Sequence, residues 1–169
     1  MRVAYADPPY LGCGAKHYGA KHPEAAKWDS LDAHKELISS LAVYDAWALS
    51  LHSPSLRVIL PLCPEDARVA AWVKPFASFK PGVNPGYCWE PLIFRGARKR
   101  SRSEPTIRDF VSANITMRKG LAGAKPAIVC EWLFNLLGLR PEDEFVDLFP
   151  GTGIVTETWN KWKAETEFD

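Results

Sequence analysis

Four consecutive residues near the start of the chain suit the binding of a flat ring that carries an amino group: Asp7, Pro8, Pro9 and Tyr10. Each proline fixes φ at about −65° and removes a backbone N–H, so the carbonyl oxygens of Asp7 and Pro8 are acceptors with fixed directions. A carboxylate beside a fixed carbonyl can accept both hydrogens of an amino group, and the ring of Tyr10 can lie on the ring that bears it. The alternative for this segment is a surface turn that happens to contain two prolines.

A second turn with chemical potential lies near the other end of the chain, between an apolar run at residues 144–149 and a helical pattern at 154–163. Its glycines, Gly151 and Gly153, let the backbone approach a ligand closely, and the start of a helix favours an anionic group. The turn lacks the third glycine of the dinucleotide fingerprint and the Lys-Ser/Thr pair of a phosphate loop, which disfavours both of those sites. A strand-to-helix turn that binds nothing is the alternative.

Together the two turns resemble the motifs of S-adenosylmethionine-dependent amino methyltransferases, especially the DNA adenine-N6 methyltransferases. Residues 7–10 are similar to the catalytic D-P-P-Y motif, and residues 146–153 resemble the D-x-F-x-G-x-G cofactor loop. The catalytic motif comes first and the cofactor loop last, as in the permuted order of the β-type enzymes. Lys125-Pro126 is similar to the K-P segment before that loop, and residues 73–75 and 90–94 resemble the strand pair after the catalytic half.

This resemblance implies transfer of a methyl group from S-adenosylmethionine to the N6 amino group of adenine in double-stranded DNA. The target base would be turned out of the duplex, because its amino group cannot be reached inside the stack. The implied catalytic residues are Asp7, Pro8, Pro9 and Tyr10. The implied cofactor-binding residues are Asp7, Lys125, Pro126, Asp147, Phe149, Pro150, Gly151, Thr152 and Gly153. The resemblance implies no metal ion.

Basic residues gather in the segment where the family places target recognition. Residues 95–102 contain five cations and no acidic residue: Arg95, Arg98, Lys99, Arg100 and Arg102. Such a run can contact backbone phosphates with a strong dependence on salt, and Lys16 and Lys21 behind the catalytic turn can also contact DNA. A solvated surface loop is the alternative for the run and for each of these lysines. His34 and His52 receive no role.

One departure from the family concerns the segment after residues 154–163. The family has a further strand there, usually ending in an acidic residue that binds the cofactor ribose, whereas here only residues 164–169 follow. Glu165, Glu167 or Asp169 can substitute, and we expect a cofactor site that is short by about one strand. The small recognition region suggests a second copy of the chain or a partner subunit. A non-catalytic nucleic-acid- or protein-binding module, an RNA methyltransferase and a cytosine-N4 methyltransferase remain alternatives.

Apolar and polar patterns predict the elements that position these residues. Apolar runs predict strands at 2–6, 56–61, 69–73, 87–94 and 144–149, although 65–71 also fits a helix. Periodicity predicts helices at 31–51, 126–137 and 154–163, with a loop at 11–29 and a mobile basic insertion at 95–125. Strands that alternate with helices imply an α/β fold, a mostly parallel Rossmann-like methyltransferase sheet with helices on both faces.

Composition is that of a compact domain: 169 residues, 47% hydrophobic, with a net charge of +1. We expect one methyltransferase domain over residues 1–169, with the basic insertion as its recognition region. The four cysteines form no C-x-x-C pair, which favours free thiols in a reducing cytosol. The sequence has no apolar stretch of about 18 residues and no secretory signal pattern, so no membrane contact is expected. The expected location is the cytoplasm of a bacterial or phage-infected cell.

Overall fold

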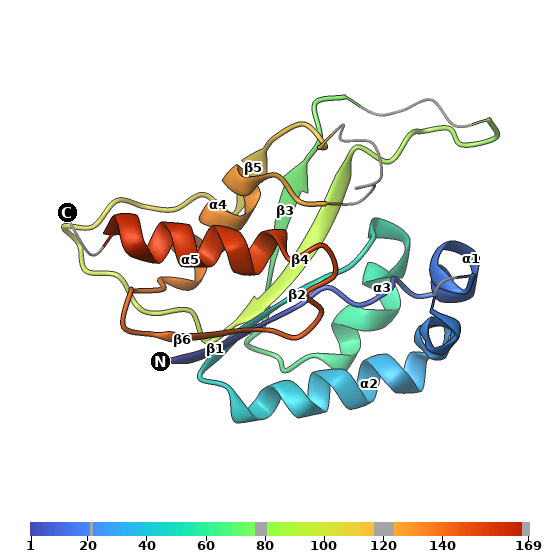
Figure 1. Ribbon diagram of the computed structural model, residues 1–169, viewed down its shortest axis with the longest axis horizontal. Coiled ribbons are helices and arrows are strands. Elements are labelled where there is room, and N and C mark those ends of the chain that lie inside the picture. The colour runs from blue at the N-terminus through green and yellow to red at the C-terminus, as the bar shows by residue number, and fades with distance from the viewer. Residues whose placement is uncertain (21, 77–80, 117–123, 167–169) are drawn as a thin grey trace.

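The computed structural model describes residues 1–20, 22–76, 81–116 and 124–166. Its centre is a six-stranded sheet in the order β5-β3-β4-β2-β1-β6 (Figure 1). The strands are β1 (Arg2–Ala6), β2 (Ala46–Ser50), β3 (Arg68–Val73), β4 (Trp89–Arg95), β5 (Phe110–Ser112) and β6 (Glu144–Asp147). Strand β1 is parallel to β2 and β6, β3 is parallel to β5, and β4 is antiparallel to both β2 and β3. All strands except β4 therefore end at the same edge, which we call the carboxyl edge.

Helices cover both faces of this sheet, as the α/β prediction requires (Figure 1). The helices are α1 (Gly14–Tyr18), α2 (Leu31–Ser40), α3 (Leu56–Ile59), α4 (Ala127–Leu137) and α5 (Ile154–Thr166). Short 3-10 turns are η1 (Pro23–Asp29), η2 (Leu41–Val43), η3 (Ser53–Ser55) and η4 (Leu60–Leu62). The fold is thus a mixed α/β sandwich of Rossmann-like type.

The core has two parts, one on each face, because successive side chains of a strand point to opposite sides. Val3 and Tyr5 of β1 join the cluster that contains α4 and α5 residues, whereas Ala4 and Ala6 join the cluster under α2 and α3. All four side chains are buried. The first strand is consequently covered from both sides, which explains why its sequence is a continuous apolar run rather than an alternating one.

A crevice is expected where β1 and β6 end. After β1 the chain passes to α2 on one face, and after β6 it passes to α5 on the other face. Neighbouring parallel strands whose connections diverge in this way leave room outside their carboxyl ends, where open α/β sheets bind ligands. Both turns singled out in the sequence follow these two strands.

The predicted helix at residues 31–51 is wrong in its second half. Helix α2 ends at Ser40, η2 adds one turn, and residues 46–50 form β2 in the middle of the sheet. Every residue of β2 is buried, with β1 on one side and β4 on the other. A fully buried strand has an apolar residue at nearly every position, so periodicity alone does not distinguish it from a helix.

The predicted strand at residues 56–61 is also wrong, because this segment forms α3 and η4. Ser55 and Ile59 are buried while Arg57 is exposed, which is the four-residue spacing of a helix face. The strand beside β1 is β2, formed by residues 46–50.

Two segments predicted to be irregular contain regular structure. Residues 11–29 include α1 and η1, which are joined because the Asp29 carboxylate accepts hydrogen bonds from the Gly14 and Ala15 amides at 2.7 and 3.0 Å. Residues 95–125 were predicted to be a mobile insertion, yet they contribute the end of β4 and the edge strand β5. Residues 117–123 of that insertion lie outside the described part of the chain.

The other predicted elements are confirmed with small shifts in their bounds. They are the strands at 2–6, 69–73, 87–94 and 144–149 and the helices at 126–137 and 154–163. Gly138 ends α4 with φ of 68°, as predicted for a glycine directly after a helix. The four cysteines, all within the described residues, form no disulfide. In the described part of the chain, no helix is both long and apolar enough to span a membrane.

Candidate active site

The structure brings the two sequence turns to one place. Strands β1 and β6 pair in register with Tyr5 opposite Asp147, and the Leu148 amide donates to the Tyr5 carbonyl at 2.9 Å. Asp7 follows β1 at the same carboxyl edge. Burial, opposed by hydrogen bonds and reinforced by the nearby charge of Asp7, raises the pKa of Asp147. The charge of Lys125 opposes this rise, so Asp7, Asp147 and Lys125 form one group of interacting charges at this edge.

The Asp7 carboxylate has one buried partner, Lys125. The Lys125 ammonium donates to Oδ2 of Asp7; the Asp7 side chain is 26% exposed, whereas Lys125 as a whole is only 7% exposed. Burial disfavours the charged amine, but the charge of Asp7, with smaller contributions from Tyr10, Tyr5 and Glu90, outweighs it and holds the pKa of Lys125 well above its ordinary value. Lys125 was predicted to bind the cofactor, and the structure pairs it with the Asp7 carboxylate, which was predicted to be catalytic.

Tyr10 is fixed at both its hydroxyl and its ring. The hydroxyl donates to Oε2 of Glu90 at 2.9 Å, and Lys74 is paired with the other oxygen of Glu90. The ring stacks on His52, with centroids 5.5 Å apart and planes inclined by 15°. Burial, together with the charge of Asp7, raises the pKa of Tyr10 well above its ordinary value, so the hydroxyl stays a neutral donor. Pro8 is buried and Pro9 half-buried between Asp7 and this anchored ring.

Three of these partners were missed by sequence reasoning. Glu90 was noted only as part of a strand resemblance, although a carboxylate inside the apolar run of β4 is itself a signal for a paired or functional group. His52 lies just beyond β2, and the erroneous helix at 31–51 concealed that it sits at the carboxyl edge. Lys74 was likewise noted only as part of the strand resemblance, and its pairing with Glu90 links it to the site.

The glycine turn leaves open space beside its backbone. Gly151 and Gly153 have φ of 47° and 79°, and a Cβ built on either would meet no heavy atom closer than 3.7 Å. The Asp147 carboxylate accepts from the Phe149 amide at 3.2 Å and from the Thr156 hydroxyl at 3.3 Å. Asp147 therefore ties the turn to the first residues of α5. Pro150 and Thr152 are exposed on this turn.

The segment between α1 and α2 packs on the glycine turn. The ring of Phe149 meets Trp28 of η1 edge to face at 5.1 Å, and His34 of α2 bonds the Trp28 carbonyl at 2.9 Å. Trp28 is a further site residue that sequence reasoning missed, because its partner lies more than a hundred positions away along the chain. This packing connects the segment after residues 7–10, which were predicted to be catalytic, to the turn predicted to bind the cofactor.

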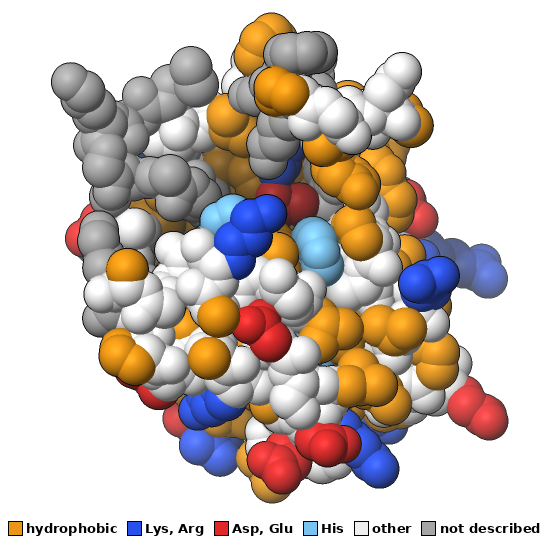
Figure 2. Space-filling view, turned by 90° about the vertical axis from the view of Figure 1, so that its right-hand side faces the viewer, with side chains coloured by type: hydrophobic (Ala, Val, Ile, Leu, Met, Phe, Trp, Pro, Cys, Tyr) orange, Lys and Arg blue, Asp and Glu red, His pale blue; other side chains and the backbone are white. Residues whose placement is uncertain are grey.

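A small cavity lies behind the anchored residues and is lined in part by Tyr5, Ser50, Trp72, Glu90 and Lys125. The Tyr5 hydroxyl bonds the Ser50 hydroxyl at 2.8 Å on one wall. Figure 2 views the carboxyl edge, which is hollowed near its middle, with an acidic and a basic side chain at the back of the hollow. Within the described residues, no group of three or more His, Cys, Asp or Glu side chains could hold a metal ion.

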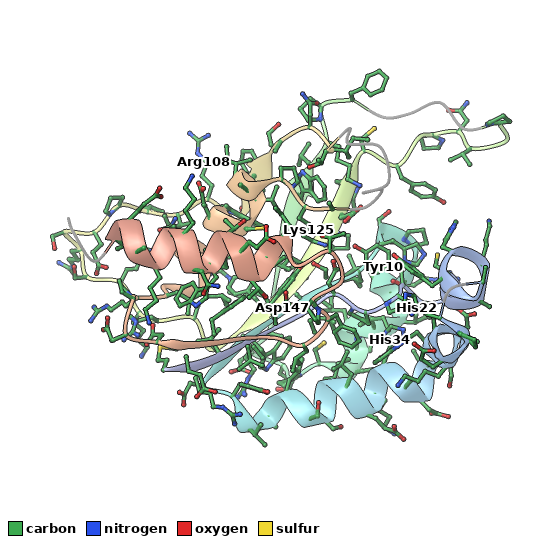
Figure 3. All side chains as sticks on the ribbon, in the orientation of Figure 1. Tyr10, His22, His34, Arg108, Lys125 and Asp147 are labelled. Atoms are coloured by element: carbon green, nitrogen blue, oxygen red, sulfur yellow. The ribbon has the colours of Figure 1, made fainter. Side chains whose placement is uncertain are left out.

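Figure 3 shows how the labelled side chains lie around this edge. Tyr10, Lys125 and Asp147 come from three separate parts of the chain: Tyr10 follows β1, Lys125 precedes α4 and Asp147 ends β6. Arg108 lies apart from them, beside β5. The charged groups of the site are therefore brought together by the sheet rather than by sequence proximity.

The basic run is placed away from this site. Strand β4 is antiparallel to β2, with Arg95 opposite Trp47, so the run begins at the edge opposite Asp7. Arg95 pairs with Asp66 at 2.7 Å, and Arg98 donates to both oxygens of the buried Asp143 at 2.7 Å each. The structure does not bring these cations to the carboxyl edge, and it gives at least two of them protein partners.

The other predicted contacts with nucleic acid are distributed as follows. Arg100 donates to the Asn135 carbonyl, while Lys99 and Arg102 are exposed near it on the same edge. Lys16 is exposed on α1, which follows the turn at residues 7–10 at the carboxyl edge (Figure 1). Lys21 lies outside the described residues. Of the predicted phosphate-contacting residues that the structure describes, only Lys16 shares an edge with Asp7.

Comparison with solved structures supports the architecture. The chain matches the crystal structure of the M1.HpyAVI–SAM complex with a TM-score of 0.65 and 14% identity, over 96% of this chain and 78% of that one. It also matches a crystal structure of M1.HpyAVI with a TM-score of 0.60 and 10% identity, over 96% and 76% of the two chains. The sequence matches no protein-family model and no curated protein. The chain therefore has the Rossmann-like α/β fold of M1.HpyAVI.

Proposed function

We propose that this chain transfers a methyl group from S-adenosylmethionine to the N6 amino group of adenine in DNA. The observation that carries the proposal is the pairing of β1 with β6, which sets the Asp7 turn beside the Gly151–Gly153 turn at one crevice. A group that accepts a methyl and a group that donates it need adjacent sites of this kind. The fold shared with M1.HpyAVI, whose structure has been solved with SAM, supports the same conclusion.

The residues at the glycine turn fit this cofactor. The space beside Gly151 and Gly153 admits a ligand close to the backbone, and the N-terminus of α5 directly after them favours a carboxylate such as that of a methionine group. The nearby carboxylates of Asp7 and Asp147 suit a positively charged sulfur. Phe149, Pro150 and Thr152 complete the turn, and Lys125, which Pro126 follows, is paired with Asp7. When bound, the cofactor supplies an electrophilic methyl group.

Asp7 and Pro8 would activate the amino group of the target base. Each accepts one amino hydrogen, the first with its carboxylate and the second with its backbone carbonyl, which localises the nitrogen lone pair that is otherwise shared with the ring. Lys125 occupies Oδ2 of Asp7, so the other carboxylate oxygen is available to the base. The chain thus contributes mainly orientation and electrostatic stabilisation.

Tyr10 would hold the flat face of the base after it leaves the duplex. Its ring is already oriented by Glu90 at the hydroxyl and by His52 on one face. A ring supported in this way loses little freedom when a base stacks on its other face, and such stacking is worth about 1–3 kcal/mol per base. Burial lowers the pKa of His52, which favours the neutral ring in this stack.

We extend the proposal to the organisation of the chain. Residues 1–169 form one methyltransferase domain whose motifs follow the permuted β-type order, because the catalytic turn at β1 precedes the cofactor turn at β6. A second copy or a partner subunit is proposed to complete recognition. Contact between residues 95–102 and DNA phosphates stays a prediction. The ion pairs that Arg95 and Arg98 form within the protein do not favour it.

The proposal is tested by methyl transfer from labelled S-adenosylmethionine to unmethylated DNA, followed by nucleoside analysis. We expect N6-methyladenine from the unaltered chain and loss of transfer in Asp7→Ala, with cofactor binding still measurable by calorimetry. Asp66→Ala is the matched control, because it removes an exposed carboxylate that is paired with Arg95 at the opposite edge.

Three outcomes contradict parts of this proposal. A folded chain that binds the cofactor but yields no product on DNA or RNA is a non-catalytic module. If the product is methylated cytosine, or if product forms on RNA alone, the proposed substrate is wrong but the proposed active site is supported. Full turnover by Asp7→Ala removes Asp7 from catalysis, whatever the product.

A further inference from the structure

A group of exposed aromatic side chains flanks the connection between β3 and β4. Phe76 is 63% exposed, Tyr87 57% and Trp89 39%, and we call these three residues the aromatic patch. Large apolar side chains are usually exposed singly, so a group of them within one connection indicates a contact surface. Figure 1 shows residues 74–76 and 81–88 of this connection beyond the upper ends of β3 and β4.

The aromatic patch lies at the carboxyl edge, next in sequence to a residue of the candidate active site. Val73, the last residue of β3, pairs with Trp89, the first residue of β4, and the Lys74 amide donates to the Cys88 carbonyl at 2.7 Å. The next residue of β4 is Glu90, whose carboxylate holds the hydroxyl of Tyr10. Trp89 of the aromatic patch is therefore adjacent along the chain to the residue that holds Tyr10.

The composition of the connection suits nucleic bases better than an acidic or basic protein surface. Residues 75–89 contain one charged residue, Lys80, and no acidic one, so nothing in the segment repels phosphate. Aromatic rings stack on any base because every base has a π-face. Enzymes that extrude a base must also compensate for the stacking that its neighbours lose, and apolar or aromatic side chains commonly fill such gaps.

We propose that Phe76, Tyr87 and Trp89 stack on the nucleotides that flank the extruded target base. This inference rests on the proposed function, because it takes the strand that carries the target as the occupant of the surface. It also explains how a chain whose basic run lies at the far edge binds nucleic acid at the carboxyl edge. The strand is held there by stacking more than by phosphate contacts.

The first experiment measures direct binding, without cofactor, of a fluorescent adenine-containing 24-mer duplex by anisotropy. Phe76→Ala/Tyr87→Ala should raise Kd at least tenfold, since each lost stack is worth about 1–3 kcal/mol. Val43→Ala is the matched control, because Val43 is 70% exposed at the end of η2, before β2 and thus at the opposite edge. We expect its Kd to change less than twofold.

The second experiment asks whether stacking, rather than bulk, is responsible. Tyr87→Phe keeps an aromatic face and Tyr87→Leu keeps only apolar volume. With 2-aminopurine next to the target adenine, the unaltered chain and Tyr87→Phe should quench its emission on binding, and Tyr87→Leu should not. In methyl transfer, the double alanine variant should raise KM for DNA with kcat within about twofold.

Failure of this inference can be distinguished from failure of the proposed function. If the unaltered chain binds the duplex and the double variant binds it more weakly, but no methyl group is transferred, the binding role of the aromatic patch is supported and the proposed enzyme activity fails. If methyl transfer proceeds and the double variant keeps the original Kd and KM, the inference is overturned. It is also overturned if the chain binds no duplex, or if the double variant changes only self-association in sedimentation, which would make the patch a contact between two copies.

Discussion

Arg98 provides a sharp test, because its sequence context predicts contact with DNA and its structural context predicts a role in stability. Its guanidinium donates to both oxygens of Asp143 at 2.7 Å and to the Gly138 carbonyl at 2.9 Å. The Asp143 side chain is only 1% exposed. We therefore expect Arg98→Ala to destabilise the fold while leaving nucleic-acid affinity nearly unchanged.

The magnitude follows from what remains after the substitution. Breaking a buried ion pair costs about 3–5 kcal/mol. In Arg98→Ala, Asp143 keeps hydrogen bonds from the Met1 ammonium and the Arg140 amide. We therefore expect the free energy of unfolding to fall by about 3 kcal/mol, the lower end of this range. For a chain of this length each kcal/mol lowers Tm by about 2–4 °C, which gives a fall of about 6–12 °C. The exposed Lys99 next to it is the control, and Lys99→Ala should stay within about 0.5 kcal/mol.

The pH dependence of the same pair gives an independent check. Burial alone would raise the pKa of Asp143, but the hydrogen bonds from the Met1 ammonium, Arg98 and the Arg140 amide outweigh it and hold that pKa below its ordinary value. When the pKa of a carboxyl group is lower in the folded chain than in the unfolded chain, its ionised form stabilises the fold. This stabilisation is fully present above the pKa of the unfolded chain and is lost as pH falls through the pKa of the folded chain. The stability difference between the unaltered chain and Arg98→Ala should therefore narrow as pH falls below about 4.

The assays are thermal and urea unfolding at several pH values, with anisotropy of a duplex at several salt concentrations. An Arg98→Ala chain that unfolds like the original, yet binds DNA more weakly with a flatter salt dependence, would refute the structural assignment. Arg98 would then be a phosphate contact, as its place in the basic run predicted.

Two further predictions concern a helix end and the anchored ring. Gly138→Ala should lower the free energy of unfolding by more than the roughly 1–2 kcal/mol that a left-handed alanine costs, because the new Cβ would lie 2.8 Å from Cβ of Arg98. Gly82→Ala is the control, since Gly82 has φ of 74° and open space, and it should show the backbone cost alone. Equal losses of stability for the two variants in thermal melts would contradict the contact with Arg98. Tyr10→Phe loses only the bond to Glu90 and should reduce methyl transfer a few-fold, whereas Tyr10→Ala should raise KM for DNA about tenfold or more. Equal defects in transfer kinetics would show that the hydroxyl, and not the ring, matters.

Local sequence signals predicted much of the candidate site. The two prolines after Asp7 fix the backbone by covalent geometry, and the turn with Gly151 and Gly153 needs positive φ, so both are visible without tertiary contacts. Helix α4 was also predictable, because its amphipathic face stops at Gly138 in a left-handed conformation. These features depend on interactions within a few residues, and a single sequence contains all that is needed to infer them.

The tertiary structure decided what depends on distant partners. Residues 46–50 are a strand because β1 and β4 flank them, and no local pattern distinguishes a fully buried strand from a buried helix. The partners Lys125 for Asp7 and Glu90 for Tyr10 lie 118 and 80 positions away, where spacing carries no information.

The basic run shows the same limit. Charge density predicted its contact with phosphate, but the antiparallel direction of β4 carries it to the far edge, where Arg98 neutralises a buried carboxylate. Sequence alone thus determined the two turns that can do chemistry and the order in which they occur. Only the sheet, through strand order and direction, decided which of them meet, because pairing between strands is set by packing over the whole chain.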